Sequence, residues 1–145
     1  MIIKVILEGK EHDIDTDRVT QINENDLSKC IVEQPSLYAW VATAHAVYES
    51  EAKRLDEAVK DKEHELYAHY KQLAEAKNEK ITERLLSARI RENPDYQTLR
   101  EKHFAVEEKR RKLKSVVFAM EHRKDMLVQL SALKRGEMKL DAMNM

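Results

Sequence analysis

The chain contains few of the residues that break helices, bind metals or form disulfides. Its 145 residues include two glycines, two prolines and a single cysteine. With only Gly9 and Gly136, the sequence lacks the glycine-rich loop that cradles phosphates in many enzymes. Because Cys30 stands alone, neither an internal disulfide nor a multi-cysteine zinc site can form within one chain, which favours a reducing compartment.

Aromatic residues and long apolar runs are also scarce. Two Phe, one Trp and five Tyr are few for a compact globule, whereas 37% of the residues are charged and 42% are hydrophobic. That composition is typical of solvated amphipathic helices, and we expect their apolar faces to be buried between chains. The apolar N-terminal run stops at Leu7, too short for a signal peptide or a membrane span. We therefore expect a cytoplasmic protein with no membrane contact.

The stretch from Pro35 to Gly136 predicts two long helical arms. No glycine interrupts it before its end, and its only interior proline lies in Asn93-Pro94-Asp95. Asn is a strong helix cap and Pro is tolerated in the first helical turn, so this tripeptide predicts a sharp restart of the helix. Three helices are expected: Ser36 to about Ala76, Glu79–Glu92 and Pro94–Arg135. Ser36 is the expected cap of the first and Asn78 that of the second.

The sequence divides into three parts. Residues 1–34 form a strand-rich docking element in which 2–7 and 11–15 pair as a hairpin, followed by a helical turn or two that Pro35 ends. Residues 35–136 form the two-arm helical domain, and 137–145 form a flexible tail after a helix stop at Gly136. The predicted fold class is mainly α: a long helical hairpin or bundle with a short N-terminal β-hairpin, assembling into a homo-oligomer.

A heptad pattern of apolar residues marks the face along which arms and subunits are expected to pack. The repeat is imperfect in arm one and unbroken in arm two. The arm-two seam consists of Leu99, Val106, Leu113, Met120 and Leu127. We expect Phe104 and Phe118 to widen this stripe. Oligomerisation is the natural way to bury stripes of this length in so small a chain.

The near-neutral net charge hides two oppositely charged halves. Residues 1–76 carry 9 Lys and Arg against 16 Asp and Glu, a net charge of -7, and residues 77–145 carry 17 against 11, a net charge of +6. The acidic N-terminal half, through Asp13, Asp15, Asp17 and Glu24, can engage a protein partner or a neighbouring subunit.

The densest basic run lies in arm two and consists of Lys109, Arg110, Arg111, Lys112 and Lys114. Two interpretations stand side by side: a solubilising face opposite the core stripe, or contact with a nucleic-acid backbone, where each neutralised phosphate releases counterions. A longer basic band is what a strand-tracking surface needs. The residues that lengthen this one are Arg89, Arg91, Arg100, Lys102, Arg123 and Lys124.

Residues with the spacing of a catalytic or metal site are not found. His64 and His69 are five residues apart, which turns the second away from the first by roughly 140° on a helix, so they cannot share one ion. The paired carboxylates sit among Lys and Arg at helical spacing, as in salt-bridged faces. We expect no enzyme activity, no metal and no cofactor. The arm-one aromatic residues are expected in the core or an interface, with only Tyr67 off the seam.

The order of motifs in 35–136 resembles that of the phage UvsY-type recombination mediators. Leu37-Tyr38-x-Trp40 opens arm one, an acidic-basic-apolar patch spans Glu51 to Leu55, and Tyr67-x-x-Tyr70 closes the arm. A second long helix then carries Arg123-Lys-Asp-Met-Leu-Val-Gln-Leu130. The N-terminal strand segment departs from the family.

The resemblance implies a protein that is not an enzyme and that helps load a RecA-like recombinase onto single-stranded DNA coated by single-strand binding protein. It also implies a ring-shaped homo-oligomer and, if the chain is phage-encoded, the cytoplasm of the host cell. The family's DNA-contact cluster falls here on Lys60 and Lys62, which acidic residues surround, so Lys53, Arg54 or the arm-two run can serve instead. The alternative is a coiled-coil scaffold or chaperone-like interaction protein without nucleic-acid binding.

Overall fold

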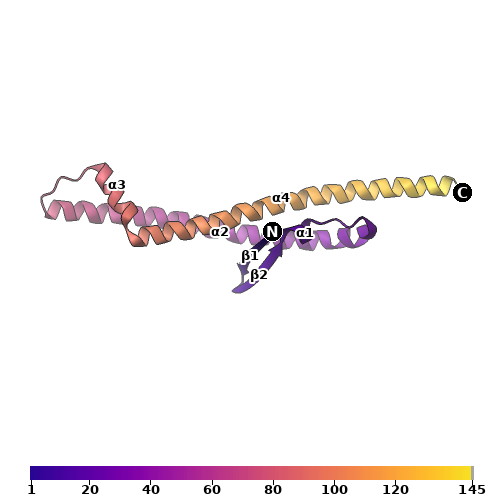
Figure 1. The fold of residues 1–145 in the computed structure, drawn as a ribbon, viewed down its shortest axis with the longest axis horizontal. Helices are drawn as coiled ribbons and strands as arrows, with labels where there is room; N and C mark the ends of the chain where they lie inside the picture. Colours follow the sequence, from indigo (N-terminus) through magenta and orange to yellow (C-terminus); the bar gives the residue numbers. More distant parts are fainter. Residues whose placement is uncertain (145) are drawn as a thin grey trace. The chain divides into compact units, whose positions relative to one another are not determined.

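The computed structural model describes residues 1–144 and is mainly α-helical (Figure 1). The strands β1 (Ile2–Leu7) and β2 (Lys10–Asp15) are followed by a short helix, α1 (Thr16–Thr20), and a 3-10 turn, η1 (Glu24–Asp26). Three further helices complete the described chain: α2 (Leu27–Ala76), α3 (Glu83–Glu92) and α4 (Pro94–Met143). The predicted fold class, mainly α with long helices and an N-terminal hairpin, is confirmed.

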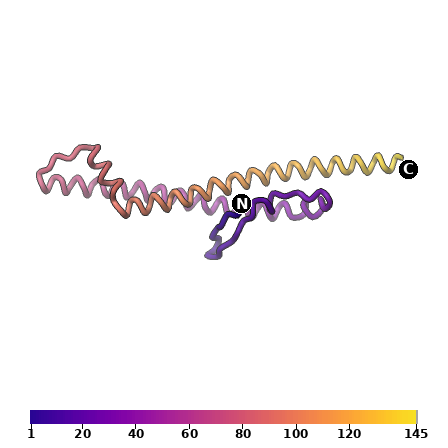
Figure 2. The backbone as a smooth tube through the Cα atoms, viewed as in Figure 1, coloured from indigo at the N-terminus to yellow at the C-terminus, as the bar shows by residue number. Residues whose placement is uncertain are grey.

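The chain forms two compact units. The first contains residues 1–47 and the chain from Arg111 onward, and the second contains residues 48–110. Helices α2 and α4 each belong to both units, and the tube in Figure 2 follows both as uninterrupted coils.

The predicted N-terminal hairpin is present, with its second strand beginning one residue earlier than expected. Its register runs from Leu7↔Lys10 at the turn to Ile2↔Asp15 at the open end. Both turn residues have left-handed backbones, with φ of 52° at Glu8 and 75° at Gly9. That combination is the two-residue turn whose twist matches the strands, and glycine adopts it without the steric cost of a side chain.

Helix α2 begins at Leu27, so the prediction of a helix start at Ser36 is wrong. Pro35 lies inside the helix, and the Ser36 hydroxyl donates to the carbonyl of Glu33 at 3.0 Å instead of capping an N-terminus. Cys30, Gln34 and Val41 are buried on both sides of the proline at helical spacing. Their burial offsets the backbone hydrogen bond that Pro35 cannot donate.

The break after α2 also differs from the prediction. Asn78 does not cap the next helix: its φ of 54° closes α2, with the N–H of Glu79 donating to the carbonyl of Ala74 at 2.9 Å. Asn adopts the left-handed conformation more readily than other non-glycine residues, which suits it to a helix end. The cap of α3 is Thr82, whose hydroxyl accepts from the N–H of Leu85 at 3.2 Å.

The predicted restart at Asn93-Pro94 is confirmed. The Asn93 side-chain oxygen accepts hydrogen bonds from the N–H groups of Asp95 and Tyr96 at 3.0 and 3.1 Å. Pro94 is the first residue of α4, where its missing N–H costs nothing. The Asn93 amide also donates to the Tyr70 hydroxyl at 3.1 Å, which attaches the helix start to α2.

The predicted helix stop at Gly136 is wrong, because α4 continues through it to Met143. The residues that follow are good helix formers, and a glycine inside a helix costs only about 1 kcal/mol relative to alanine. Residues 137–143, predicted as a flexible tail, therefore extend the helix; Met145 lies outside the described residues.

The arm-two seam is buried most deeply in the first unit. There Leu113, Met120 and Leu127 are buried, whereas Leu99 and Val106 in the second unit are half-buried. Phe104 and Phe118 are 60% and 62% exposed, so they do not widen the stripe that is buried within one chain. In the second unit, Leu66, Ile90 and Tyr96 form a cluster that joins α2, α3 and α4, with Val59, Tyr67 and Tyr70 packed against it.

Candidate nucleic-acid interface

The arm-two basic run divides into inward-facing and outward-facing cations. Arg110 is mostly buried and bonds Glu107 through two nitrogens, at 2.9 and 2.5 Å. This hydrogen-bonded carboxylate raises the pKa of Arg110 above its ordinary value. The Lys109 ammonium lies 5.9 Å from the centre of the Tyr48 ring. Lys109 and Arg110 therefore stabilise the second unit, and Arg111, Lys112 and Lys114 are exposed.

The cations that the resemblance singled out on α2 are paired with acidic residues of the same helix. Lys53 lies 3.9 Å from Glu49, Arg54 lies 3.8 Å from Glu51, Lys60 lies 3.1 Å from Asp56, and Lys62 lies 3.5 Å from Glu65. Residues 48–76 carry five basic against eight acidic residues, a net charge of -3. Because these charges compensate one another locally, this surface attracts a polyanion weakly.

Arg123 does not extend the basic band, contrary to the prediction. Its side chain is only 4% exposed, and its Nε donates to the carbonyl of Gln21 at 3.0 Å. Its Nη1 donates to the side-chain oxygen of Gln34, whose amide donates in turn to the carbonyl of Met120 at 2.9 Å. Arg123 thus joins the segment before η1 to α2 and α4. Lys124, its neighbour, is exposed.

Most cations of α3 and of the first turns of α4 are exposed, although Arg89 is half-buried and the Arg100 guanidinium lies 5.7 Å from the centre of the Tyr96 ring. Within residues 1–144, no ion pair involves Arg84, Arg91, Arg100 or Lys102, and all four are exposed; the same holds for Arg111 and Lys114. Residues 83–114 carry ten basic against six acidic residues, a net charge of +4. Sequence reasoning missed Arg84, although its spacing of seven from Arg91 places both on one side of α3.

Two exposed phenylalanines accompany the outward cations. Phe104 lies one helical turn after Arg100 in the second unit, and Phe118 lies one turn after Lys114 in the first, so each ring shares a side of α4 with a cation. The Phe118 ring meets His122 edge-on, with centroids 4.8 Å apart. Exposed rings next to unpaired cations provide the stacking surface and positive charge that single-stranded nucleic acids require.

The aromatic residues of arm one lie in contacts within the fold, as expected for most of them. Tyr67, predicted to lie off the seam, packs against the second-unit cluster and donates from its hydroxyl to Glu83 at 2.8 Å. That bond raises the pKa of Tyr67, and a bond to Glu121 raises the pKa of Tyr38 in the same way. The ring of Trp40 lies edge-on to His12, with centroids 6.4 Å apart.

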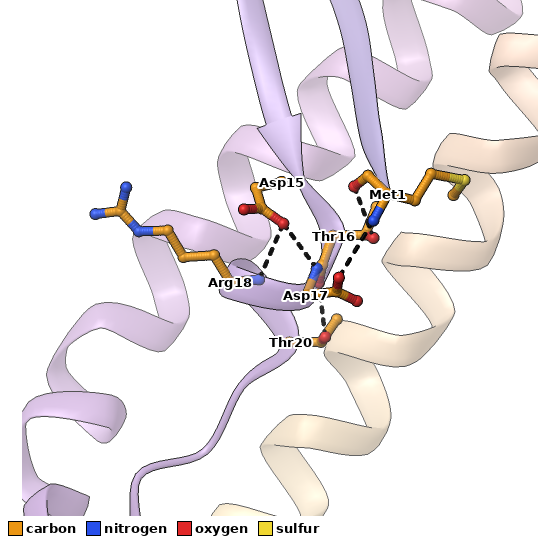
Figure 3. Close-up of polar contacts among 6 residues, drawn as sticks. All are labelled: Met1, Asp15, Thr16, Asp17, Arg18 and Thr20. Carbon is orange, nitrogen blue, oxygen red and sulfur yellow. Dashed lines mark hydrogen bonds and ion pairs between the residues drawn. The ribbon is translucent and has the colours of Figure 1, made fainter.

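Two of the acidic residues of the N-terminal element have structural roles (Figure 3). The Asp15 carboxylate accepts from the N–H groups of Asp17 and Arg18, which caps α1, and the Asp17 carboxylate lies 3.2 Å from the Met1 amino group. Thr16 donates to the carbonyl of Met1 at 2.9 Å. Asp13 and Glu24 are exposed and have no ion pair in the described chain.

Residues 1–144 contain neither a cluster of metal ligands nor a membrane-spanning helix. No three or more His, Cys, Asp or Glu side chains come together in a way that can hold a metal ion. None of the helices is both long enough and apolar enough to cross a bilayer. Comparison of the chain with protein-family models, with curated proteins and with solved structures finds no match in any of the three.

Proposed function

We propose that this protein is a single-stranded-DNA-binding recombination mediator that helps load a RecA-like recombinase onto DNA coated by single-strand binding protein. The observation that carries the proposal is the distribution of unpaired cations. Arg84, Arg91, Arg100, Lys102, Arg111 and Lys114 are exposed without ion pairs in residues 1–144, whereas the α2 cations are neutralised by their own helix. Unpaired cations release counterions when they meet phosphates.

The preference for a single strand rests on the exposed rings. Phe104 and Phe118 each present an aromatic face beside a cation, and base stacking requires bases that are not already paired in a duplex. Loading of a recombinase and exchange with single-strand binding protein follow from the resemblance of 35–136 to the UvsY-type mediators. The protein acts without enzymatic chemistry or cofactor, in the cytoplasm of the host cell if it is phage-encoded.

A homo-oligomer, ring-shaped in the resembled family, is the second part of the proposal. From Ala132 to Met143 every residue of α4 is exposed, including Leu133, Met138 and Leu140. An exposed helix with several large apolar side chains is stabilised when a second copy covers them. Several copies also place several weak DNA sites on one strand, which raises the overall affinity.

The test is binding of the full chain to fluorescent oligo-dT, followed by anisotropy across a salt series with a duplex of equal length alongside. We expect preference for the single strand, weakened by salt. The Arg111→Glu/Lys114→Glu variant should bind about tenfold or more weakly with a shallower salt dependence, because phosphate contacts are lost. Lys10→Glu/Lys29→Glu changes the net charge equally at exposed sites outside the interface and should retain binding. Equal loss in both variants, or no binding at low salt, would reject the proposal.

A second candidate function rests on an apolar groove in the first unit. The groove has a volume of about 850 Å³ and is lined by Ile31, Pro35 and Tyr38 of α2 and by Leu127, Val128 and Ser131 of α4. Such a groove suits a coiled-coil scaffold or chaperone-like protein that binds partner helices without nucleic acid. Salt separates the two functions, because apolar association persists at ionic strengths that release DNA.

A further inference from the structure

The outer edge of β2 has backbone groups without hydrogen-bond partners. The two-residue turn makes Leu7↔Lys10 a hydrogen-bonded pair, and such pairs alternate along an antiparallel ladder. The bond from the N–H of Thr16 to the carbonyl of Met1, at 2.9 Å, confirms this alternation. The N–H and C=O groups of Glu11 and Asp13 therefore point away from β1, and no residue of 1–144 bonds to them. An open edge of this kind is a template for another strand.

A cavity of about 520 Å³ lies beside this edge. Asp13 and Asp15 line it from β2, and Glu33, Leu37 and Trp40 line it from one side of α2. Leu37 and the half-buried Trp40 are apolar residues that line the same cavity as Asp13, and the Trp40 ring meets the ring of His12 in β2 edge-on. The edge of β2 therefore offers both hydrogen bonds and apolar contacts, the two elements with which sheet edges bind extended peptides.

The charge of the surroundings selects the kind of segment that fits. Residues 1–26 carry seven acidic against three basic residues, a net charge of -4. Asp13 and Asp26, both at the cavity, have no ion pair among the described residues. Three cations also line the cavity. Lys29 is paired with Glu33 at 3.9 Å, and Arg123 donates to two oxygens of the fold, so Arg18 is the one of the three whose charge is not used within the described chain.

We propose that the outer edge of β2 binds an extended, basic segment of a partner protein, which adds to the hairpin as a third strand. Side chains directly opposite each other on neighbouring strands share a face of the sheet, so basic residues of the segment lie opposite Glu11 and Asp13. Alternate apolar residues of the segment face Leu37 and Trp40. A second copy of this chain fits poorly, because antiparallel pairing of β2 with itself would place carboxylates opposite carboxylates.

The probe is a labelled Lys-Val-Lys-Val-Lys-Val-Lys peptide, added to the full chain and followed by anisotropy and by Trp40 fluorescence. Trp40 is the single tryptophan of the chain and lines the cavity, so its emission reports binding at this edge. The control peptide carries backbone N-methyl groups on the lysines. In antiparallel addition the lysines lie opposite Glu11 and Asp13, and their N–H groups donate to the β2 edge. The control peptide keeps the charge but loses these hydrogen bonds, and we expect its affinity to fall at least about tenfold.

A matched pair of variants completes the test. Glu11→Gln/Asp13→Asn removes two carboxylates at the edge, and Glu8→Gln/Glu24→Gln removes two outside it. We expect the first to weaken peptide binding about tenfold and the second to leave it nearly unchanged. Equal binding of the N-methylated peptide, or equal effects of the two variants, would overturn the proposal. Loss of peptide binding at high protein concentration would instead show that a second copy occupies the edge.

The outcome does not depend on the proposed DNA interface. Neither Glu11 nor Asp13 belongs to the cations of α3 and α4, so Glu11→Gln/Asp13→Asn should bind oligo-dT as the unmodified chain does. A failure of peptide binding with intact oligo-dT binding rejects the strand-addition proposal alone, and the reverse result rejects the DNA proposal alone.

Discussion

Single residues of one chemical type serve different purposes along α4. Arg123 is buried and hydrogen-bonded to Gln21 and Gln34, Arg110 is paired with Glu107, and Arg111 is exposed without an ion pair in the described chain. The same guanidinium group is thus a structural link, a partly buried ion pair and a candidate phosphate contact. What differs is the position on the helix relative to the buried face.

Replacement of Arg123 should destabilise the fold rather than act on DNA directly. Arg123→Ala leaves the Gln34 side chain and the Gln21 carbonyl without their donor in a buried site, and we expect a loss of about 2–4 kcal/mol in the free energy of unfolding. Urea denaturation measures the loss. Lys124→Ala, one residue on and exposed, is the control and should change stability by less than about 0.5 kcal/mol. An equally small effect of both substitutions would contradict the structural role of Arg123.

Replacement of Phe104 should weaken DNA binding and leave the stability of the fold nearly unchanged, the opposite of what is expected for Arg123. The ring is exposed, so Phe104→Ala should leave the melting temperature nearly unchanged. If bases stack on the ring, oligo-dT affinity should fall about five- to tenfold, since stacking on an aromatic side chain contributes about 1–3 kcal/mol per base. Phe104→Tyr keeps an aromatic face and should retain most of the affinity. Loss of affinity in the tyrosine variant too would count against stacking.

At the scale of elements, local sequence signals decide some helix boundaries, whereas the rest of the fold decides others. Asn93-Pro94 starts α4 because the cap and the fixed φ of proline act within one turn. Pro35 and Gly136 were expected to end helices, yet both lie inside them. Each costs a limited free energy that the rest of the helix offsets.

The helical position of Gly136 leads to a stabilising substitution. A Cβ at Gly136 would meet no atom within 4 Å, and its φ is not left-handed. Gly136→Ala should therefore raise the free energy of unfolding by about 0.5–1 kcal/mol, mainly by restricting the unfolded chain. Thermal denaturation measures the change. The same substitution at Gly9, with φ of 75°, should destabilise the fold and serves as the control. Destabilisation at Gly136 would show that the helix stops there.

At the scale of the whole molecule, apolar residues divide into those that the chain buries and those that it leaves exposed. Leu113 is fully buried in the first unit, whereas Leu133 is 61% exposed on the last part of α4. The heptad repeat predicted the burial of Leu113. Buried and exposed apolar residues together fit the composition expected of a chain that associates with copies of itself. The exposed set is the candidate oligomer interface.

Two substitutions separate packing within the chain from packing between chains. Leu113→Asp buries an unpaired carboxylate and should cost several kcal/mol, so the variant should unfold or melt early. Leu133→Asp should keep the circular dichroism spectrum and shift sedimentation velocity toward a smaller species. An unaltered sedimentation coefficient for Leu133→Asp would place the subunit contact elsewhere on the molecule.

Much of the candidate interface is predictable from the sequence. Whether each cation is exposed and without an ion pair is not. The run at 109–114 and the excess of positive charge in the second half are properties of composition. Which cations are free depends on neighbours: Arg110 meets Glu107 within one helical turn, a spacing visible in the sequence, whereas Arg123 meets Gln21, about a hundred residues away. Long-range contacts of this kind have no local signature.

The sequence by itself determined the helical class, the N-terminal hairpin and the break at Asn93-Pro94, because caps, turns and apolar periodicity act through near neighbours. Only the tertiary structure decided that α2 passes through Pro35, that Arg123 is buried, and that Phe104 and Phe118 face outward. For Pro35 and Arg123, burial against distant segments outweighs the local preference, and the two phenylalanines lie on faces of α4 that no distant segment of the described chain covers. The free energy of packing depends on which surfaces meet in space.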